Sequence, residues 1–394
     1  MTVDQTASPG VGHDVGVECR VIDSFDELQR YEREWDRLAV ACGKPTCRPA
    51  WLRAWWEASC GPADQDSRAL RVVVVTEGGR LVAMFPGFVV NQKSRLPDLR
   101  LLAEGRFWSV EPLVSDDAPR ETLALFARAL SETSPPPARL LIECAPTQAE
   151  WLRELQRQWR GGPARLRRAP RGSKLLVVEG PMSSEAWLAG MPQSRRADLR
   201  RRARRRAEAG VVVRLTDTPG EVRDDVHALA QLHHARWNWQ SQWLTEGVED
   251  TIVQAGQLLV RSGDFRLWKV LRGEEVIGAA LFARAGDVSE LLLTAYDPGW
   301  SRLAPGLAAI VAGIRHDLDT GIRLIDFGYG GFKYLQRLSN AERPVVGYEL
   351  FPTNRKMPIA RARWLIPPHR RINIWRGRLR LRTRLRALRD QNQS

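Results

Sequence analysis

The chain has 394 residues and a formal charge of +14, which is enough length for two ordinary domains with substantial cores. It contains no run of about 18 apolar residues, and its first residues lack the basic-then-apolar pattern of a secretory signal. These observations exclude a membrane-spanning helix and indicate a cytoplasmic protein. The five cysteines are odd in number and lack zinc-finger spacing, so we expect reduced thiols and no metal site.

Positive charge is concentrated in two segments. Residues 195–206 hold eight Arg and one Asp, and residues 355–394 hold thirteen basic residues and one Asp. These segments carry +7 and +12, so the rest of the chain carries −5. The first is typical of a solvated helix or of a clamp for the phosphates of tRNA, a nucleotide or an anionic lipid. The second suits either a basic amphipathic helix on a membrane surface, at the inner face of the membrane, or a disordered tail.

The predicted elements of the first half begin with a strand, 17–22, and two amphipathic helices, 25–40 and 49–59. A hairpin of strands 70–76 and 80–90 turns at Gly78 and Gly79. The half ends with a helix, a strand, a helix and a strand, at 122–131, 139–144, 148–160 and 173–178. Several tryptophans of the helices recur at helical spacing, which favours a core role over a groove for carbohydrate or lipid.

The second half repeats this order. Helices at 183 onward and 194–209 precede a strand, 211–215, two helices, 221–239 and 251–262, and a hairpin, 265–271 and 276–283. Then come a strand at 289–295, a turn at 297–299, a helix at 305–320 closed by Gly321, a strand at 323–327 and a glycine-rich loop at 328–331. The pattern predicts a duplicated α/β unit whose mixed sheet is flanked by helices.

We therefore divide the chain into four parts. A disordered leader covers 1–16, the first unit 17–179, the second unit 180–350 and the basic amphipathic tail 351–394.

The helix start at Pro305-Gly306 is the feature that most directly predicts a ligand. It follows a strand end and a Gly/Pro loop, and the first N–H groups of a helix have no partner inside the helix. Such a corner offers N–H groups and a favourable dipole to an anion. The sequence thus predicts a pyrophosphate site there.

An ordered set of motifs carries a family resemblance over about residues 17–350. The set is EWDRLAVACGKPTCRPAWLRAWWEAS, SRRADLRRRARR, LHHARW, AYDPGWSRLAPG and DFGYGGFKYL. It resembles the CelD/BcsL-type acetyltransferases associated with cellulose biosynthesis, which are GNAT-like N-acyltransferases, and it is similar to the Fem-type aminoacyl transferases. The resemblance implies a tandem GNAT-like fold whose second unit binds the acyl donor. Phe332 and Leu335 stand where the family often has an acidic residue and a lysine around the tyrosine, here Tyr334.

Acyl transfer needs a held donor, a polarised carbonyl, a base and a proton for the leaving group. The candidate residues divide into three groups. Donor-binding candidates are Arg302, Gly306, Leu307 and Ala308. Catalytic candidates are Tyr334, Asp326, His233 and Tyr296, and acceptor-binding candidates are His234, Trp237 and Gly330. Each has a structural alternative: a helix start, a capped or packed histidine, a core aromatic, or an aspartate that caps the glycine loop.

The predicted activity is transfer of an acetyl or other acyl group from acyl-CoA to an amine of a sugar, a polysaccharide precursor or a small metabolite. One alternative is an aminoacyl-tRNA-dependent transferase, indicated by the Fem-like duplication and the arginine helix. The other is a degenerate acyltransferase fold that acts as an adaptor and binds anionic surfaces through its tail.

Overall fold

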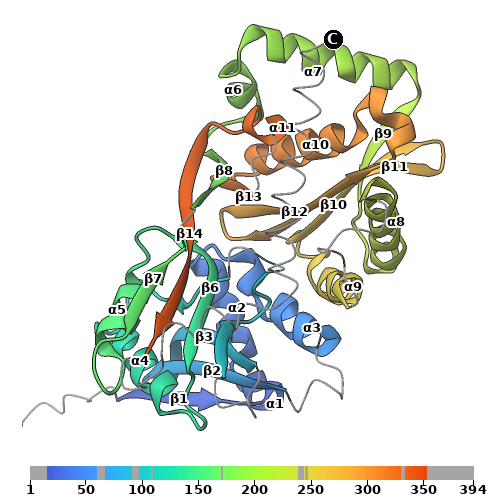
Figure 1. Cartoon of the computed structure of the whole chain (residues 1–394). Coiled ribbons are helices and arrows are strands. Elements are labelled where there is room, and N and C mark those ends of the chain that lie inside the picture. Colours follow the sequence, from blue (N-terminus) through green and yellow to red (C-terminus); the bar gives the residue numbers. More distant parts are fainter. Residues whose placement is uncertain are drawn as a thin grey trace, which may run out of the picture. The chain divides into compact units, whose positions relative to one another are not determined.

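The computed structural model describes residues 16–59, 67–90, 97–105, 107, 110–169, 172–237, 244, 247–329 and 333–352 (Figure 1). The first half forms β1 (Val17–Ile22), α1 (Phe25–Leu28), η1 (Gln29–Tyr31), α2 (Glu32–Ala41), η2 (Pro45–Cys47), α3 (Pro49–Ser59), β2 (Arg68–Glu77), β3 (Arg80–Val90), β4 (Asp98–Leu101), β5 (Leu113–Val114), α4 (Thr122–Glu132), β6 (Arg139–Pro146), α5 (Glu150–Gln158) and β7 (Arg165–Arg168). The second half forms β8 (Ser173–Glu179), α6 (Ser184–Ala189), α7 (Gln193–Glu208), β9 (Val211–Leu215), α8 (Pro219–Trp237), α9 (Val248–Leu259), β10 (Phe265–Arg272), β11 (Glu275–Ala285), β12 (Val288–Tyr296), η3 (Pro298–Leu303), α10 (Pro305–Asp319), β13 (Leu324–Tyr329), α11 (Lys333–Gln336) and β14 (Ala341–Phe351).

The described strands form one mixed sheet whose order is nearly symmetric. It runs β1-β2-β3-β4-β6-β14-β8-β13-β12-β11-β10-β9, with β5 added to β3 and β7 added to β14. Each end contributes an antiparallel hairpin, β2–β3 or β10–β11, and each half has one parallel pair, β4–β6 or β12–β13. The predicted mixed α/β fold with a repeated unit is confirmed by this arrangement.

The two halves meet through strands β8 and β14. Strand β14, at the end of the described chain, pairs antiparallel with β6 of the first half and with β8. Strand β8 also pairs with β13 of the second half. The predicted boundary at 179/180 places β8 in the first unit, and the strand β14 is absent from the predicted elements. The described residues up to Pro352 form one compact unit, and the division at 179/180 stays a prediction.

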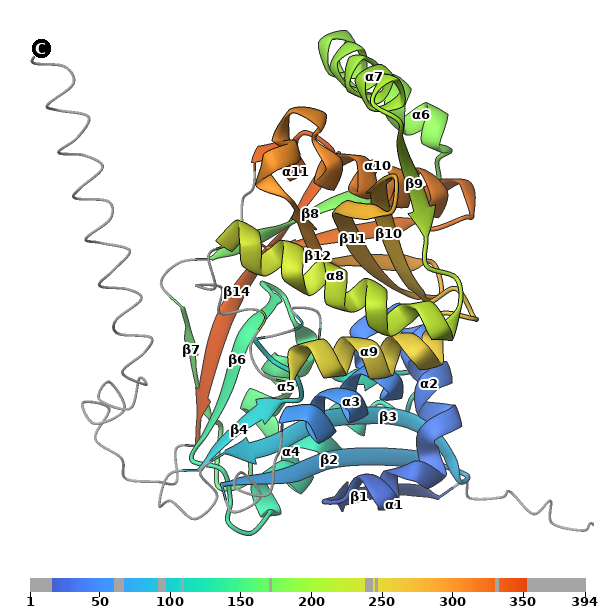
Figure 2. The same cartoon turned by 90° about the vertical axis from the view of Figure 1, so that its right-hand side faces the viewer.

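Helices cover both faces of the sheet (Figure 2). In the second half α8 and α9 pack on one face of β10–β12, α10 packs on the other, and α9 also packs against α3 of the first half. One apolar core accordingly runs from the first half, around Trp35 and Trp51, into the layer of α8 and α9. A second core lies beneath α10, where Ile310 and Ile314 pack with Phe282.

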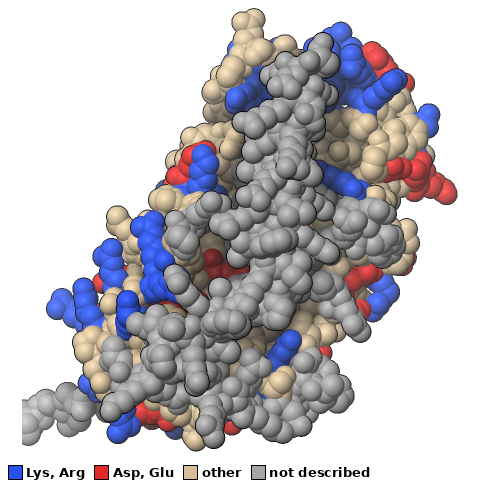
Figure 3. Space-filling model, in the orientation of Figure 1, with Lys and Arg blue, Asp and Glu red and all other residues tan. Residues whose placement is uncertain are grey.

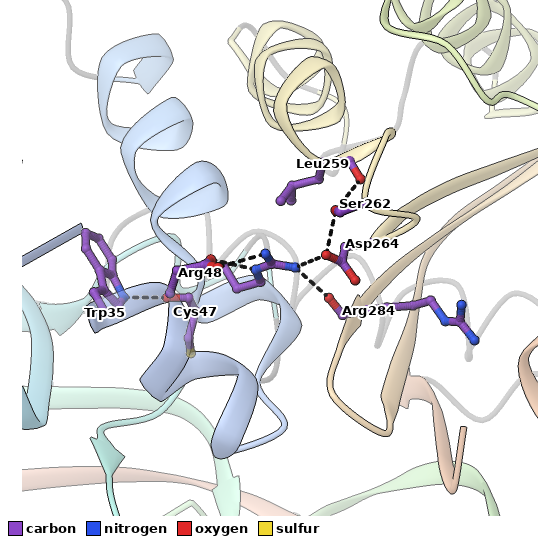
Figure 4. A network of polar contacts seen from close by, with 8 residues as sticks. Trp35, Cys47, Arg48, Leu259, Ser262, Asp264 and Arg284 are labelled. Carbon is purple, nitrogen blue, oxygen red and sulfur yellow. Dashed lines mark hydrogen bonds and ion pairs between the residues drawn. The ribbon is translucent and has the colours of Figure 1, made fainter. Parts of the chain in front are cut away.

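A buried arginine ties α2 to the second half (Figure 4). Arg48 donates to both carboxylate oxygens of Asp36, at 2.8 and 3.0 Å. Its Nη1 lies 2.6 Å from Asp264 Oδ2 and donates to the Arg284 carbonyl at 3.3 Å. Because Arg48 is only 6% exposed, these bonds satisfy a charge that would otherwise be costly to bury. The planar guanidinium suits such a multidentate site.

The predicted helices and strands of the second half are confirmed, with ends shifted by at most three residues wherever the structure describes them. The single helix predicted over residues 25–40 is wrong in detail, because the 3-10 turn η1 interrupts it and separates α1 from α2. The chain from residue 353 onward, which includes the predicted amphipathic tail, lies outside the described residues. In the part that is described, no helix has the length and apolarity needed to cross a membrane.

Candidate active site

The corner between β12 and α10 brings the first turn of a helix beside the end of a strand. After β12, Asp297 accepts a hydrogen bond from the Gly299 N–H at 2.7 Å and starts the turn η3. Ala304 then adopts the left-handed conformation (φ +49°), which is unfavourable for a residue with a Cβ and often marks a functional site. Pro305 begins α10, and the N–H groups of Gly306 and Leu307 follow in the first turn, before intrahelical acceptors exist.

A cavity of about 270 Å³ opens beside this first turn. Gly306 and Leu307 of α10 and Thr294 and Tyr296 of β12 form one side. The other sides come from elements distant in sequence: Arg195, Asp198, Leu199 and Arg202 of α7, Arg236 of α8, Tyr334 of α11 and Arg337. The corner is thus an open site, as the donor-binding hypothesis requires.

The arginine helix α7, which lies above α10 in Figure 2, lines one side of this cavity with Arg195, Asp198, Leu199 and Arg202. Arg206 donates to the Leu303 carbonyl at 3.2 Å, and Arg195 donates to the Arg337 carbonyl at 3.0 Å. Asp198 accepts from Arg202 at 2.8 Å and also pairs with Arg201. Lys and Arg side chains gather around this end of the molecule in Figure 3. The site therefore carries an excess of positive charge, which favours a phosphorylated ligand.

Arg236 connects the two tyrosines of the cavity. Its guanidinium lies 4.6 Å from the centre of the Tyr296 ring, and its side chain hydrogen-bonds Tyr334. Burial raises the pKa of the Tyr334 hydroxyl, and the nearby charge of Arg236 opposes this shift. The Tyr334 phenol is consequently protonated at neutral pH and can act as a hydrogen-bond or proton donor.

Strands β12 and β13 separate next to the cavity. They are paired only over residues 288–290 and 324–326, and the last pair is Glu290 with Asp326. Immediately beyond this pair β12 has a bulge against β11. Leu291 pairs with Phe282 and Leu293 pairs with Leu281, so Leu292 has no partner in this register. Leu292 and Leu293 consequently face the same core, whereas Leu291 faces the core beneath α10. A bulge leaves backbone groups outside the ladder, here at the opening between two strands.

Glu290 and Asp326 face the first half of the chain. Asp326 lies between Ile325 and Phe327, which both pack beneath α10, so the alternation of the strand directs it to the opposite face. Glu290 is 2% exposed and accepts a hydrogen bond from Thr46 at 3.3 Å. Asp326 accepts from the Gly328 N–H at 2.7 Å, so it caps the start of the glycine loop, which was the alternative considered for it. The residues described offer no cluster suited to a metal ion.

The predicted site residues divide between this cavity and its surroundings. Tyr296, Gly306, Leu307 and Tyr334 line the cavity. The other donor and acceptor candidates do not line it. Ala308 is buried in the core beneath α10 and donates its N–H to the Ala304 carbonyl, and Arg302 is exposed on η3. Gly330 and the side chain of Trp237 lie outside the described residues. The roles assigned to all of these residues stay predictions.

His233 and His234 lie on α8, and neither lines the cavity. The two rings are 6.2 Å apart, and His233 is 5% exposed. Burial, followed by the charges of His234 and Arg236, lowers the pKa of His233 to about 4. The imidazole is therefore neutral at neutral pH and a weak base, which fits the packed-histidine alternative better than general-base catalysis.

Sequence reasoning missed several residues that shape the site. Arg236, Arg195 and Arg337 come to the cavity from three separate elements, and Glu290 sits beside Asp326 through strand pairing alone. An acidic residue inside the apolar run SELLLTA was the one available signal for Glu290, because charged residues are rarely buried in a strand without a role.

Comparison with known proteins gives three findings. The family model of the acetyltransferase (GNAT) domain matches residues 193–335, which include α7, the cavity corner and Tyr334. The crystal structure of FemX superposes with a TM-score of 0.60 at 12% identity, covering 82% of this chain and 96% of FemX. No curated protein sequence shows significant similarity to the chain.

Two other solved structures share the fold. One is the C-terminal domain of a protein assigned as a lysylphosphatidylglycerol synthetase from Agrobacterium fabrum, with a TM-score of 0.53 at 11% identity over 82% of this chain and 92% of that domain. The other is a conserved protein of unknown function from Bacteroides thetaiotaomicron, with a TM-score of 0.51 at 8% identity over 85% of this chain and all of that protein. The chain therefore has a GNAT-type acyltransferase fold, and residues 193–335 are similar to the GNAT acetyltransferase domain.

Proposed function

We propose that the protein transfers an acyl group from acyl-CoA to an amine of a sugar, a polysaccharide precursor or a small metabolite. The observation that carries the proposal is the cavity at the first turn of α10, where backbone N–H groups, several arginines and a tyrosine hydroxyl converge beside two separating strands. Charge-assisted hydrogen bonds to a pyrophosphate there would each contribute about 1.5 to 3 kcal/mol to binding. The CelD/BcsL-type resemblance is consistent with this activity.

Among the described residues of the first half, the corner equivalent to the start of α10 is less suited to a phosphate. Helix α4 holds the position in the first repeat that α10 holds in the second, between the strands of the parallel pair. The loop before α4 carries Asp116, Asp117 and Glu121 against one arginine, Arg120, and this excess of carboxylates beside the first turn disfavours a phosphate. The donor is therefore assigned to the second half alone.

The chemistry follows from the groups around the strand opening. The amine nitrogen attacks the thioester carbonyl, and backbone N–H at the β12 bulge stabilises the negative charge that develops on its oxygen. Glu290 accepts the proton of the amine from the face opposite α10. The carbon–sulfur bond then breaks. The Tyr334 hydroxyl, which is protonated at neutral pH, gives its proton to the thiolate. Asp326 holds the glycine loop in place.

The substitution Gly306→Glu tests the donor site. A Cβ at Gly306 would point toward Tyr296 Cδ1 and Thr294 Oγ1, at 3.2 and 3.4 Å, so the new carboxylate would enter the cavity. We expect at least a hundredfold loss of acyl-CoA affinity and of acyl transfer or acyl-CoA hydrolysis, from lost contacts and charge repulsion. Gly220→Glu at the start of α8, where a Cβ meets no atom within 4 Å, has the same charge change and serves as the control. A folded Gly306→Glu protein with full affinity and activity would disprove the assignment.

A second candidate is transfer from an aminoacyl-tRNA, and the position of α7 on the cavity favours it. Helix α7 presents arginines outward as well as inward, a surface that suits a nucleic-acid backbone. The likeness to the domain assigned as a lysylphosphatidylglycerol synthetase, whose name denotes an aminoacylated lipid product, is compatible with this chemistry. Activity in this case would be sensitive to ribonuclease and would fall steeply with salt. Activity unchanged by ribonuclease would eliminate this candidate.

A further inference from the structure

We propose that the inner face of α7 makes the site selective for a carrier that bears a phosphate monoester in addition to its pyrophosphate. The inference rests on the proposed function and narrows its donor. Arg195 and Arg202 project into the cavity from α7, and Arg337 adds a third guanidinium from the chain after α11. The pyrophosphate is assigned to the first turn of α10, near Arg202, so Arg195 and Arg337 form a second, separate group of phosphate-binding side chains.

The arginines are more numerous than structural needs explain. Four of them line the cavity, and Asp198 is the one carboxylate among the described lining residues. Asp198 is already matched by Arg202 and Arg201 on its own helix. Among the residues described, Arg195 and Arg337 form no ion pair with a carboxylate. Arg195 instead donates a hydrogen bond to the Arg337 carbonyl. Positive charges that face the same cavity without carboxylate partners raise its positive electrostatic potential, which favours binding of a polyvalent anion.

The packing of α7 also indicates a ligand. The helix has no fully buried residue, and Leu199 is its half-buried apolar contact with the core beneath α10. Arginine-to-carbonyl bonds at Arg195 and Arg206 hold the two ends. A helix anchored so weakly gains little from apolar burial. Its charged inner face is therefore better explained by contacts to a ligand than by contacts to the fold.

The spacing of the inner face separates two binding positions. Arg202 lies one helical turn from Arg206, which touches the Leu303 carbonyl just before α10, so Arg202 is near the first turn of that helix. Arg195 lies seven residues earlier, which is about 10 Å along the helix, and meets Arg337. A phosphate monoester carries a charge of about −1.5 to −2 at neutral pH, so it gains more from the position at Arg195 and Arg337 than a neutral ribose would. Coenzyme A, with a 3′-phosphate beside its pyrophosphate, has this chemistry.

Calorimetric titration of the full chain with CoA and with 3′-dephospho-CoA tests the proposal. We expect the full chain to bind CoA about tenfold to a hundredfold more tightly than 3′-dephospho-CoA, the contribution of one or two charge-assisted contacts. Arg195→Gln should reduce this ratio to about threefold or less, by weakening CoA binding alone. Arg204→Gln is the matched control, because Arg204 is exposed on the opposite side of the same helix and its loss removes the same charge. The thermal midpoints of both variants report whether α7 is still folded.

The possible results separate this inference from the proposed function. Equal affinity for CoA and 3′-dephospho-CoA in the full chain overturns the inference and leaves acyl-CoA as the donor. An equal loss of selectivity in Arg195→Gln and Arg204→Gln also overturns it, because the effect would then be one of net charge. Failure of both compounds to bind, with tight binding of an RNA that ends in CCA, overturns the proposed function together with the inference.

Discussion

The substitution Gly278→Ala isolates the placement of the α10 first turn from the rest of the fold. Gly278 lies on β11 opposite Tyr296 of β12, directly beneath the start of α10. An added Cβ would lie 2.7 Å from Pro305 Cβ, 3.0 Å from the Pro305 carbonyl carbon and 3.1 Å from the Gly306 nitrogen. Two of these three atoms belong to the backbone, so a side-chain rotation cannot relieve the contact. The first turn of α10 must move by about 0.5 to 1 Å to restore ordinary contact distances.

The size of the effect follows from the same distances. Overpacking of this kind destabilises a fold by about 1 to 3 kcal/mol, and replacing a strand glycine by alanine recovers about 0.5 to 1 kcal/mol. We therefore expect the free energy of unfolding to fall by about 1 to 2 kcal/mol. The displaced N–H groups of Gly306 and Leu307 should lose about one charge-assisted hydrogen bond to the donor. That loss corresponds to roughly tenfold weaker CoA binding.

Two alanine variants provide the controls. Gly313→Ala affects the same helix about 12 Å further along, where the new Cβ would lie 2.3 Å from Cε2 of the Phe282 ring. It should destabilise the protein at least as much as Gly278→Ala without changing CoA affinity. Gly220→Ala, in open space, should change neither quantity. Urea unfolding and calorimetry give both numbers for each variant. If Gly278→Ala and Gly313→Ala are equally destabilised and bind CoA equally well, the first turn of α10 does not hold the donor.

Three further outcomes follow from single side chains. Replacing Arg48 by Met should lower the free energy of unfolding by about 2 to 4 kcal/mol, because Asp36 and Asp264 lose their shared partner. Urea unfolding measures this change. An unchanged urea midpoint would mean that this contact does not hold α2 to the second half. The pKa of His233 is about 4 in the folded chain and 6.5 in the unfolded chain, so between these values only the unfolded chain gains a proton. The free energy of unfolding should therefore be full above pH 6.5 and fall by about 3 kcal/mol as the pH drops to 4. In urea unfolding, His233→Gln should flatten this pH dependence, and an unaltered pH dependence would contradict the lowered pKa of His233. Tyr334→Phe should lower kcat by about a hundredfold with little change in the KM for acyl-CoA, measured by thiol release; an unaffected kcat would remove proton donation as the role of this hydroxyl.

The corner of the site was predictable because its signals are local. Pro305 and Gly306 directly follow a turn and precede an apolar helical pattern, so the helix start could be read from neighbouring residues. Local signals also predicted both hairpins and the repeated order of elements. The structure confirms the mixed α/β fold that this order predicts. Local signals also misled, since the periodicity over residues 25–40 did not show the 3-10 turn.

The rest of the site depends on contacts between distant residues. Strand β14 contains Glu342, Arg343 and Pro344, a poor strand pattern, and it forms because β6 and β8 provide pairing partners on both sides. The arginines of α7 reach the cavity because Arg206 bonds the end of η3, Arg195 bonds the residue after α11, and Leu199 packs on the core beneath α10. No spacing in the sequence indicates that Arg236 lies over the Tyr296 ring, a contact between elements separated by 60 positions along the chain.

The arrangement of the strands gives each half a separate part in the proposed reaction. The donor cavity lies on the α10 side of β12, whereas Glu290 and Asp326 face the first half, with Thr46 in contact with Glu290. The acyl group would reach the acceptor through the opening where β12 and β13 separate. The first half, which has carboxylates before α4 in place of a phosphate corner, would then help to form the acceptor side. Exchange of β8 and β14 between the repeats fixes the two sides of this opening relative to each other, as transfer between two bound substrates requires.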